Sequence, residues 1–225
     1  MAGQTRPCPV IAIDGPVGAG KSTVAQALAQ RLGYRYVDTG AMYRAVAWKA
    51  RAEGVDVNDR EAVAAIARAV QIEFLPGRRG QHILVDGADV TETIRSPQIS
   101  ERASIVSAYP EVREAMVALQ RRMGKDGCVV MEGRDIGTVV FPDAEVKIYL
   151  DATLDERARR RYEELRRKRE RVTLEGVRQA LEQRDRRNST RTHSPLRPAD
   201  DSTAIDTTSM SVKQVVGEIL KRVPR

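Results

Sequence analysis

One stretch near the start of the chain limits its fold more than any other. Residues 15–22 read GPVGAGKS and match the pattern G-x-x-x-x-G-K-[ST] at every position. An apolar run at residues 10–13 predicts a buried strand before the loop, and Val24, Ala25, Leu28 and Leu32 follow it at helical spacing. A phosphate-binding loop lies between a strand and a helix in this order. A glycine-rich turn that binds no ligand would not need this arrangement, so the pattern favours a phosphate-binding loop.

Each residue type in the loop suits a phosphate. Glycines let the backbone approach an anion and point its N–H groups inward, and the helix that follows adds its positive N-terminal end. Lys21 is expected to reach the β- and γ-phosphates of ATP, and the Ser22 hydroxyl is expected to bind Mg²⁺. The predicted phosphate-binding residues are Gly15, Pro16, Val17, Gly18, Ala19, Gly20, Lys21, Ser22 and Thr23.

The composition places the chain among soluble proteins with a core. Its 225 residues are 41% hydrophobic, and no apolar run approaches the length that crosses a bilayer. The N-terminus lacks the apolar segment that is typical of a signal peptide. Cys8 and Cys128 show no spacing of a disulfide framework or a metal site, and Cys128 is expected to be a small buried hydrophobe. We therefore expect a cytoplasmic protein with no membrane partner.

The net charge of +7 is concentrated in one segment. Residues 157–191 hold 14 lysines and arginines against six acidic residues, whereas the rest of the chain holds 24 against 25. The segment can be a solvated helix face, a nucleic-acid patch or an anion-binding lid. The phosphate loop favours the lid, and an aromatic content of 4% leaves few stacking platforms for a single-stranded nucleic acid.

The remaining pattern alternates between strands and helices. Residues 71–91 alternate in polarity around two turn signals and predict a small antiparallel insert. The alternation elsewhere predicts an α/β fold, a P-loop NTPase-type parallel sheet with helices on both faces and ligands at the carboxyl ends of its strands. Capping-box spacing marks three helix starts, at Asn58, Thr153 and Ser211. The other predicted strands are 34–37, 128–131, 146–150 and 204–206, a helix is expected over 173–184, and 188–201 is expected to be a loop.

Four longer segments carry a resemblance to a known family. They read DTGAMYR at 38–44, SAYPEVRE at 107–114, EGRDIGTVVFPDA at 132–144 and SPLRPADD at 194–201. With the phosphate loop, they make the chain resemble bacterial cytidylate kinase, a nucleoside monophosphate kinase, from end to end. The resemblance implies a single P-loop kinase domain over 1–225, with an inserted monophosphate-binding subdomain at about 66–105 and an Arg-rich helical lid at about 153–172.

The resemblance also implies an activity and its residues. The family phosphorylates CMP and dCMP with ATP and Mg²⁺. By correspondence, Arg44, Arg134 and Arg191 would hold the phosphate of CMP near Thr39, and Arg184 and Asn188 would meet the sugar. Ser104, Arg113 and Asp135 would read the base. Tyr43 and Gly133 complete the implied CMP site, Arg157 would contact ATP, and Lys21, Arg134 and Arg191 would be catalytic.

The proposed chemistry agrees with these residue types. A monophosphate is already an anionic nucleophile, so catalysis needs positioning and charge stabilisation rather than a general base. Arginine binds phosphate oxygens bidentately. The Asp135 carboxylate can accept from the amino group of cytosine, whereas uracil presents a carbonyl there. The two histidines, His82 and His193, receive no catalytic role.

Other interpretations stay open at this point. Arg44 and Arg113 could form surface salt bridges, Arg134 and Asp135 a structural ion pair, and Ser104 could be a helix-surface serine. Competing functions are a P-loop kinase for UMP, AMP or a metabolite, a nucleic-acid-binding protein, and a nucleotide switch without turnover. Asn188 stands where the family commonly has Asp, which we expect to alter discrimination between CMP and dCMP. We expect a monomer with nucleotides, and no nucleic acid, as partners.

Overall fold

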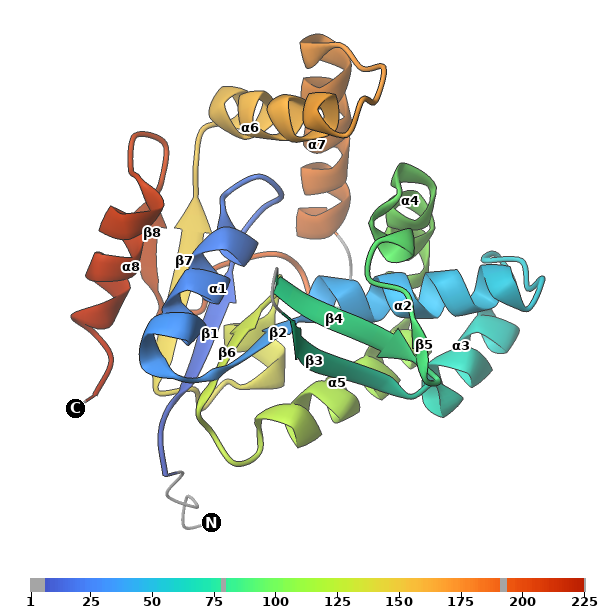
Figure 1. Ribbon diagram of the computed structural model, residues 1–225, viewed down its shortest axis with the longest axis horizontal. Coiled ribbons are helices and arrows are strands. Elements are labelled where there is room, and N and C mark those ends of the chain that lie inside the picture. Colours follow the sequence, from blue (N-terminus) through green and yellow to red (C-terminus); the bar gives the residue numbers. More distant parts are fainter. Residues whose placement is uncertain (1–6, 78–79, 191–193, 225) are drawn as a thin grey trace. The chain divides into compact units, whose positions relative to one another are not determined.

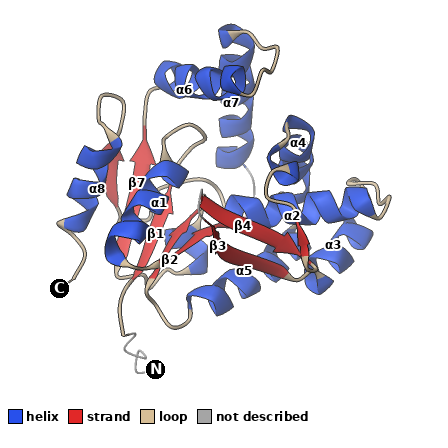
Figure 2. Cartoon of the chain, in the orientation of Figure 1, coloured by secondary structure: helices blue, strands red, loops and turns tan. Residues whose placement is uncertain are grey.

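The chain divides into two compact units, which are described separately. The computed structural model describes residues 7–77, 80–190 and 194–224. Unit 1 is drawn from Met1–Tyr36 and Gly124–Arg225, and unit 2 is Val37–Met123. Figure 1 labels the elements, and Figure 2 shows the alternation of helices and strands that the sequence predicts.

A five-stranded sheet forms the centre of unit 1. Its strand order is β2-β6-β1-β7-β8, and β1 pairs in parallel with both β6 and β7, as β7 does with β8. All five residues of β1 are buried, which explains its continuous apolar sequence. The strands are β1 (Val10–Asp14), β2 (Arg35–Asp38), β6 (Val129–Glu132), β7 (Val146–Asp151) and β8 (Thr203–Asp206).

Two helices of unit 1 pack on this sheet, and two form a separate pair. Apolar side chains of α1 and α8 share a core with β1, β6 and β7, in which Leu28 and Ile219 are fully buried. The α6–α7 pair has its own small core around Ala158 and Leu181. The elements are α1 (Lys21–Leu32), the π-helical turn η2 (Ile136–Val140), α6 (Leu154–Arg167), α7 (Leu174–Thr190) and α8 (Val212–Leu220).

Unit 2 combines helices with the predicted antiparallel insert. Its three strands pair in the order β3-β4-β5, and Asp86 and Gly87 both have positive φ in the tight turn between β4 and β5. Ile83 and Val85 bury the inner face of β4. The elements are α2 (Thr39–Ala52), α3 (Arg60–Ala69), β3 (Ile72–Gly77), β4 (Gly80–Val85), β5 (Ala88–Asp89), the 3₁₀ turn η1 (Thr93–Arg95), α4 (Pro97–Val106) and α5 (Pro110–Gly124).

Several local predictions need correction. The N-cap of α3 is Asp59 and not Asn58, because the Asp59 carboxylate accepts from the amide of Ala62. Thr153 caps α6, but the Glu156 carboxylate turns to neighbouring arginines instead of completing a capping box. The capping box at Ser211 is confirmed.

Helix α7 is longer than the sequence predicts. It continues to Thr190 instead of ending near residue 184, so the first residues of the expected loop, including Asn188, are helical. A polar tract without glycine or proline can extend a helix whose earlier turns are already packed. No helix in the described ranges is long and apolar enough to cross a membrane.

The prediction for the cysteines is wrong. Cys8 and Cys128 form a disulfide with Cα atoms 5.0 Å apart. Cys8 lies just before β1 and Cys128 just before β6, and the register pairs Val10 with Val129. Because neighbouring parallel strands begin side by side, two cysteines 120 residues apart meet. Spacing along the chain cannot reveal this pairing.

Candidate active site

The phosphate loop has the backbone that its glycines predict. It leaves the carboxyl end of β1, and Gly15, Gly18 and Gly20 all have positive φ. A Cβ on Gly15 would lie 2.0 Å from the carbonyl oxygen of Leu150 on β7, so no other residue fits there without a shift of the backbone. Ser22 and Thr23 are exposed in the first turn of α1. The loop therefore presents backbone donors and two hydroxyl groups beside a helix N-terminus.

Lys21 is held inside this loop beside other cations. Its ammonium group donates to the carbonyl of Pro16 at 2.8 Å, and its side chain is almost completely buried. Burial and the positive charges of Arg134 and Arg184 lower the pKa of Lys21 to about 7, against the opposing effect of Glu132 and Asp14. Arg134, in the segment after β6, and Arg184, on α7, are thus both close enough to repel the charge of Lys21. A polyanion bound among them would relieve that repulsion.

The segment after β6 carries Gly133, Arg134 and Asp135. The amide of Gly133 donates to the carbonyl of Ile13 at 2.9 Å, and the guanidinium of Arg134 donates to the carbonyl of Gly15. Burial lowers the pKa of Arg134. Asp135 is 5% exposed and immediately precedes η2. The structure thus places the predicted Arg134 at the beginning of the phosphate loop.

Arg157 is already engaged within unit 1. Its guanidinium donates to the carbonyls of Ala152 and Val17 and forms an ion pair with Asp185 on α7, with Nη1 and Oδ2 2.5 Å apart. A Cβ on Gly18 would lie 2.9 Å from the Arg157 Cβ, so α6 packs directly on the phosphate loop. Arg157 therefore links α6, α7 and the phosphate loop.

The sugar-contact candidates lie on α7. Arg184 is close enough to Lys21 to lower its pKa. The Asn188 Nδ2 and Asp185 Oδ1 atoms are buried and have no hydrogen-bond partner among the described residues. Arg191, predicted to be a phosphate ligand, lies outside the described residues.

Unit 2 brings together two of its own candidates through the DTG segment. The Asp38 carboxylate accepts from the amide of Ala41 and caps α2, and its other oxygen pairs with Arg44 at 2.7 Å. Thr39, the first residue of α2, is 3% exposed. Arg44 does form a salt bridge, but its partner belongs to the same motif and their side chains are 22% and 16% exposed.

Of the other candidates of unit 2, Arg113 lies beside Tyr43. The guanidinium of Arg113 lies 5.7 Å from the centroid of the Tyr43 ring, and Arg113 is 5% exposed. Arg113 also donates to the carbonyl of Ser107, whose hydroxyl donates to the carbonyl of Ser104 at 3.1 Å. Arg113 is therefore a buried residue and not a surface salt bridge.

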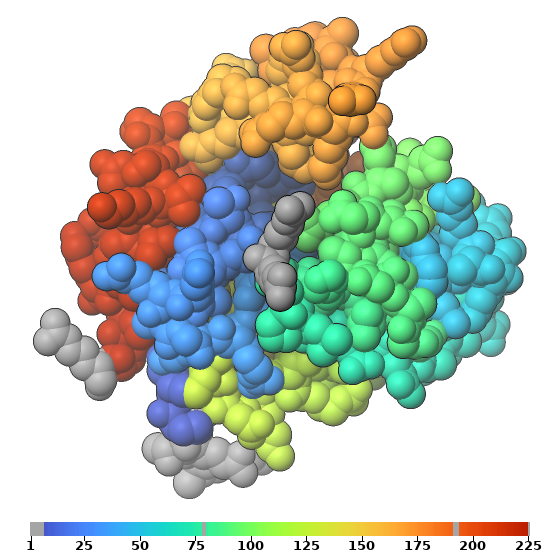
Figure 3. Space-filling model, viewed as in Figure 1, coloured from blue at the N-terminus to red at the C-terminus, as the bar shows by residue number. Residues whose placement is uncertain are grey.

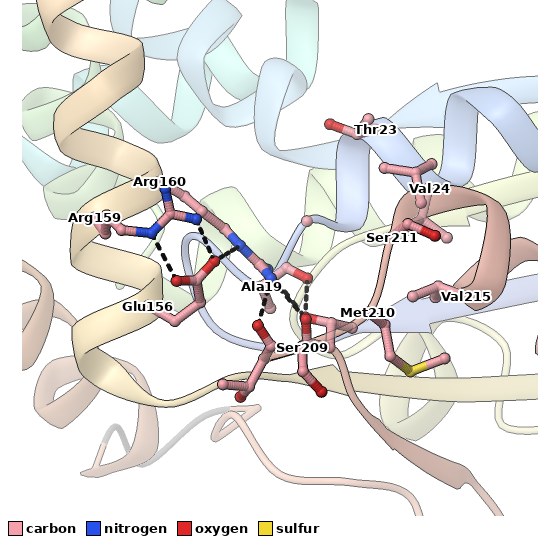
Figure 4. Close-up of a pocket in the computed structure, with 14 residues that line it drawn as sticks. Ala19, Thr23, Val24, Glu156, Arg159, Arg160, Ser209, Met210, Ser211 and Val215 are labelled. Carbon is pink, nitrogen blue, oxygen red and sulfur yellow. Dashed lines mark hydrogen bonds and ion pairs between the residues drawn. The ribbon is translucent and has the colours of Figure 1, made fainter.

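A cavity of about 440 Å³ lies beside the phosphate loop (Figure 4). Glu156 on α6 pairs with both Arg159 and Arg160 there. Arg160 also donates to the hydroxyl and the carbonyl of Thr207, and the Thr207 hydroxyl contacts the carbonyl of Ala19 at 3.1 Å. The volume lies within the range of small-molecule sites. Its lining includes Ala19, Thr23, Glu156, Arg160, Thr207 and Met210.

The sequence prediction missed several residues of this site. Asp14, Asp185 and Thr207 received no role, although they are buried or hold predicted site residues. The sequence signal for Asp14 is its position directly before the phosphate loop. The basic segment, orange in Figure 3, lies on the surface of the molecule, and its arginines pair mainly within α6 and with α7. Among the described side chains, no group of three His, Cys, Asp or Glu could hold a metal ion.

Comparison with known proteins identifies relatives over nearly the whole chain. A family model described as cytidylate kinase matches residues 11–225. The cytidylate kinase of Geobacillus kaustophilus (strain HTA426) is 51% identical over 213 residues, which cover 95% of both chains. That of Solibacter usitatus (strain Ellin6076) is 52% identical over 216 residues, or 95% of this chain and 91% of the relative. A crystal structure of an uncharacterized protein from Eubacterium ventriosum has a TM-score of 0.52 at 12% identity, covering 95% and 96% of the two chains, and supports the fold alone.

Proposed function

Because this chain belongs to the cytidylate kinase family, we propose that it transfers the γ-phosphoryl group of ATP to CMP and dCMP with the help of Mg²⁺. The observation that carries the proposal is the group of cations at the phosphate loop, around the buried Lys21. Arg134 and Arg184 both repel the positive charge of Lys21 in the absence of a ligand, and the lowered pKa of Lys21 reflects this. Phosphoryl transfer supplies the negative charge that such a group stabilises.

The transfer needs positioned charge and no general base. The attacking group is a phosphate oxygen of CMP, which is anionic at neutral pH. Lys21 and Arg134 would neutralise charge on the transferring group, and the backbone N–H groups of the phosphate loop would orient it. His82 is exposed in the antiparallel insert and pairs with Asp89, which agrees with the absence of a catalytic role.

The donor side fits ATP and Mg²⁺. The cavity beside Ala19 and Thr207 adjoins the phosphate loop and would take the nucleoside part of ATP. Ser22 is exposed at the start of α1, and its hydroxyl is a hard oxygen donor of the kind that Mg²⁺ prefers. When bound, Mg²⁺ would supply charge neutralisation between the β- and γ-phosphates.

We propose acceptor contacts for the candidates of each unit by itself. In unit 2, Thr39 and Arg44 would hold the CMP phosphate, and Ser104 and Arg113 would contact the base beside Tyr43. In unit 1, Arg134 and Arg191 would hold the phosphate, Asp135 would accept from the cytosine amino group, and Arg184 and Asn188 would meet the sugar. We also propose residues 66–105 as the monophosphate-binding subdomain and residues 153–172 as the lid over ATP.

The reaction can be observed directly by ³¹P NMR. The purified chain, ATP, Mg²⁺ and CMP should give the paired α and β signals of CDP together with ADP, and chelation of Mg²⁺ should stop the conversion. Lys21→Met, which removes the cation but keeps most of the side-chain volume, should reduce turnover by at least about 100-fold. Persistence of the CMP signal with the wild-type protein would refute the proposal.

A further inference from the structure

One buried carboxylate joins the two loops at the centre of unit 1. Asp14 is the last residue of β1 and is 5% exposed. Its Oδ1 accepts from the amide of Ile136 and its Oδ2 from the amide of Gly137, each at 2.8 Å. Both oxygens are therefore bound by consecutive amides of the segment that follows β6.

The two neighbours of Asp14 in the chain, Ile13 and Gly15, hold the same segment at two further points. The carbonyl of Ile13 accepts from Gly133, and the carbonyl of Gly15 accepts from Arg134. Asp14 lies between these two anchors, and its side chain binds the residues just after Asp135. The backbone of residues 133–137 is therefore held by hydrogen bonds on both sides of Arg134 and Asp135.

The contact requires a carboxylate at position 14. A Cβ on Gly137 would lie at an ordinary contact distance of 3.5 Å from Asp14 Oδ2 and 3.3 Å from the Lys147 side chain on β7, so Gly137 lies against the Asp14 carboxylate. An asparagine at position 14 has one oxygen, and its NH₂ group would face the second backbone donor. Burial raises the pKa of Asp14 to about 7 although both amides lower it. The fold thus places a carboxyl group where burial disfavours its charged form.

We propose that Asp14 is a positioning residue that holds the loop of residues 133–137, and with it Arg134 and Asp135, in the geometry that binds CMP. The proposal rests on the function proposed above and adds a residue to it. Asp14 does not need to touch either nucleotide. Its effect should fall on CMP, because its hydrogen bonds go to the segment that carries Asp135, whereas the glycines and amides of the phosphate loop remain in place.

The test compares Asp14→Asn and Asp14→Ala with a matched control. Asp200→Asn makes the same chemical change at a carboxylate that is 99% exposed. The KM for CMP should rise about tenfold in Asp14→Asn and further in Asp14→Ala, whereas the KM for ATP should rise by less, through the loss of the Asp14 charge that acts on Lys21. Asp200→Asn should leave both values unchanged. Equal effects on the two substrates, or none, would overturn the proposal.

Hydrogen exchange gives a second measurement that does not depend on activity. The amides of Ile136 and Gly137 should exchange at least about tenfold faster in both Asp14 variants than in the wild type, while amides in α8 keep their rates. Unchanged exchange would contradict the proposal, and so would a general loss of protection, because Asp14 would then support the whole unit. If the wild-type protein leaves CMP unchanged, the proposed function fails, and the two amides still report on the role of Asp14 in holding the loop.

Discussion

The buried position of Lys21 predicts that ATP binding takes up a proton. In the free protein, burial and the charge of Arg134 lower the pKa of Lys21 to about 7, so most of Lys21 is neutral at pH 8.5. Bound phosphates favour the charged form and restore a high pKa. Binding at pH 8.5, where the phosphates of ATP are already fully ionised, should therefore take up roughly one proton.

Isothermal titration calorimetry measures this uptake. The apparent binding enthalpy is recorded in buffers of different ionisation enthalpy, and its slope gives the number of protons taken up. The association constant for ATP should also fall about tenfold per pH unit above pH 7, because the charged lysine that ATP binds becomes rarer in the free protein.

Lys21→Arg is the matched control for this experiment. Arginine keeps the positive charge but does not lose its proton in this range, so residual binding by the variant should show no uptake. Uptake in the variant equal to that of the wild type would place the titrating group elsewhere, with Asp14 the nearest candidate. No uptake in the wild type would refute the interpretation of Lys21 as a neutral amine in the free protein.

Three further outcomes are expected. Gly15→Ala should lower the free energy of unfolding by about 2–5 kcal/mol, because its Cβ would lie 2.0 Å from the Leu150 carbonyl oxygen. Gly33 also has positive φ, but its added Cβ would meet no neighbouring atom within 4 Å, so Gly33→Ala should lower it by only about 1–2 kcal/mol. Chemical denaturation measures both losses, and equal losses would contradict the steric argument. Reduction of the disulfide should lower the free energy of unfolding by about 2–5 kcal/mol and expose two thiols to a thiol reagent; two reactive thiols in the untreated protein would contradict the pairing. Asn188→Asp should change the ratio of kcat/KM for CMP and dCMP, and an unchanged ratio would exclude Asn188 as the sugar-discriminating residue.

The sequence predicted those features that local pattern determines. The strand, loop and helix around Lys21 follow from an apolar run, three glycines with positive φ and helical spacing, all within 23 residues. The antiparallel insert follows from alternation and the Asp86–Gly87 turn. These signals depend on neighbours along the chain, so a single sequence contains them.

Pairings between distant segments could not be predicted in the same way. The disulfide depends on β1 and β6 being neighbours in the sheet, and the role of Asp14 depends on the segment after β6 meeting the end of β1. The resemblance implies that Arg157 contacts ATP, but the sequence does not reveal that its guanidinium pairs with Asp185, which is 28 residues away on another helix. A charged residue reveals its partner only when tertiary packing is known.

The acceptor specificity of the enzyme is the most direct test of the account. A coupled assay of ADP release, with ATP and Mg²⁺, would compare kcat/KM for CMP, dCMP, UMP and AMP. The account predicts turnover with CMP and dCMP, and a loss of at least about 100-fold with UMP, whose base presents a carbonyl where Asp135 would accept from the cytosine amino group, and with AMP, whose two-ring base is larger than cytosine. A preference for UMP or AMP would contradict the assignment of the base-reading residues, and no turnover with any of the four would contradict the proposed reaction.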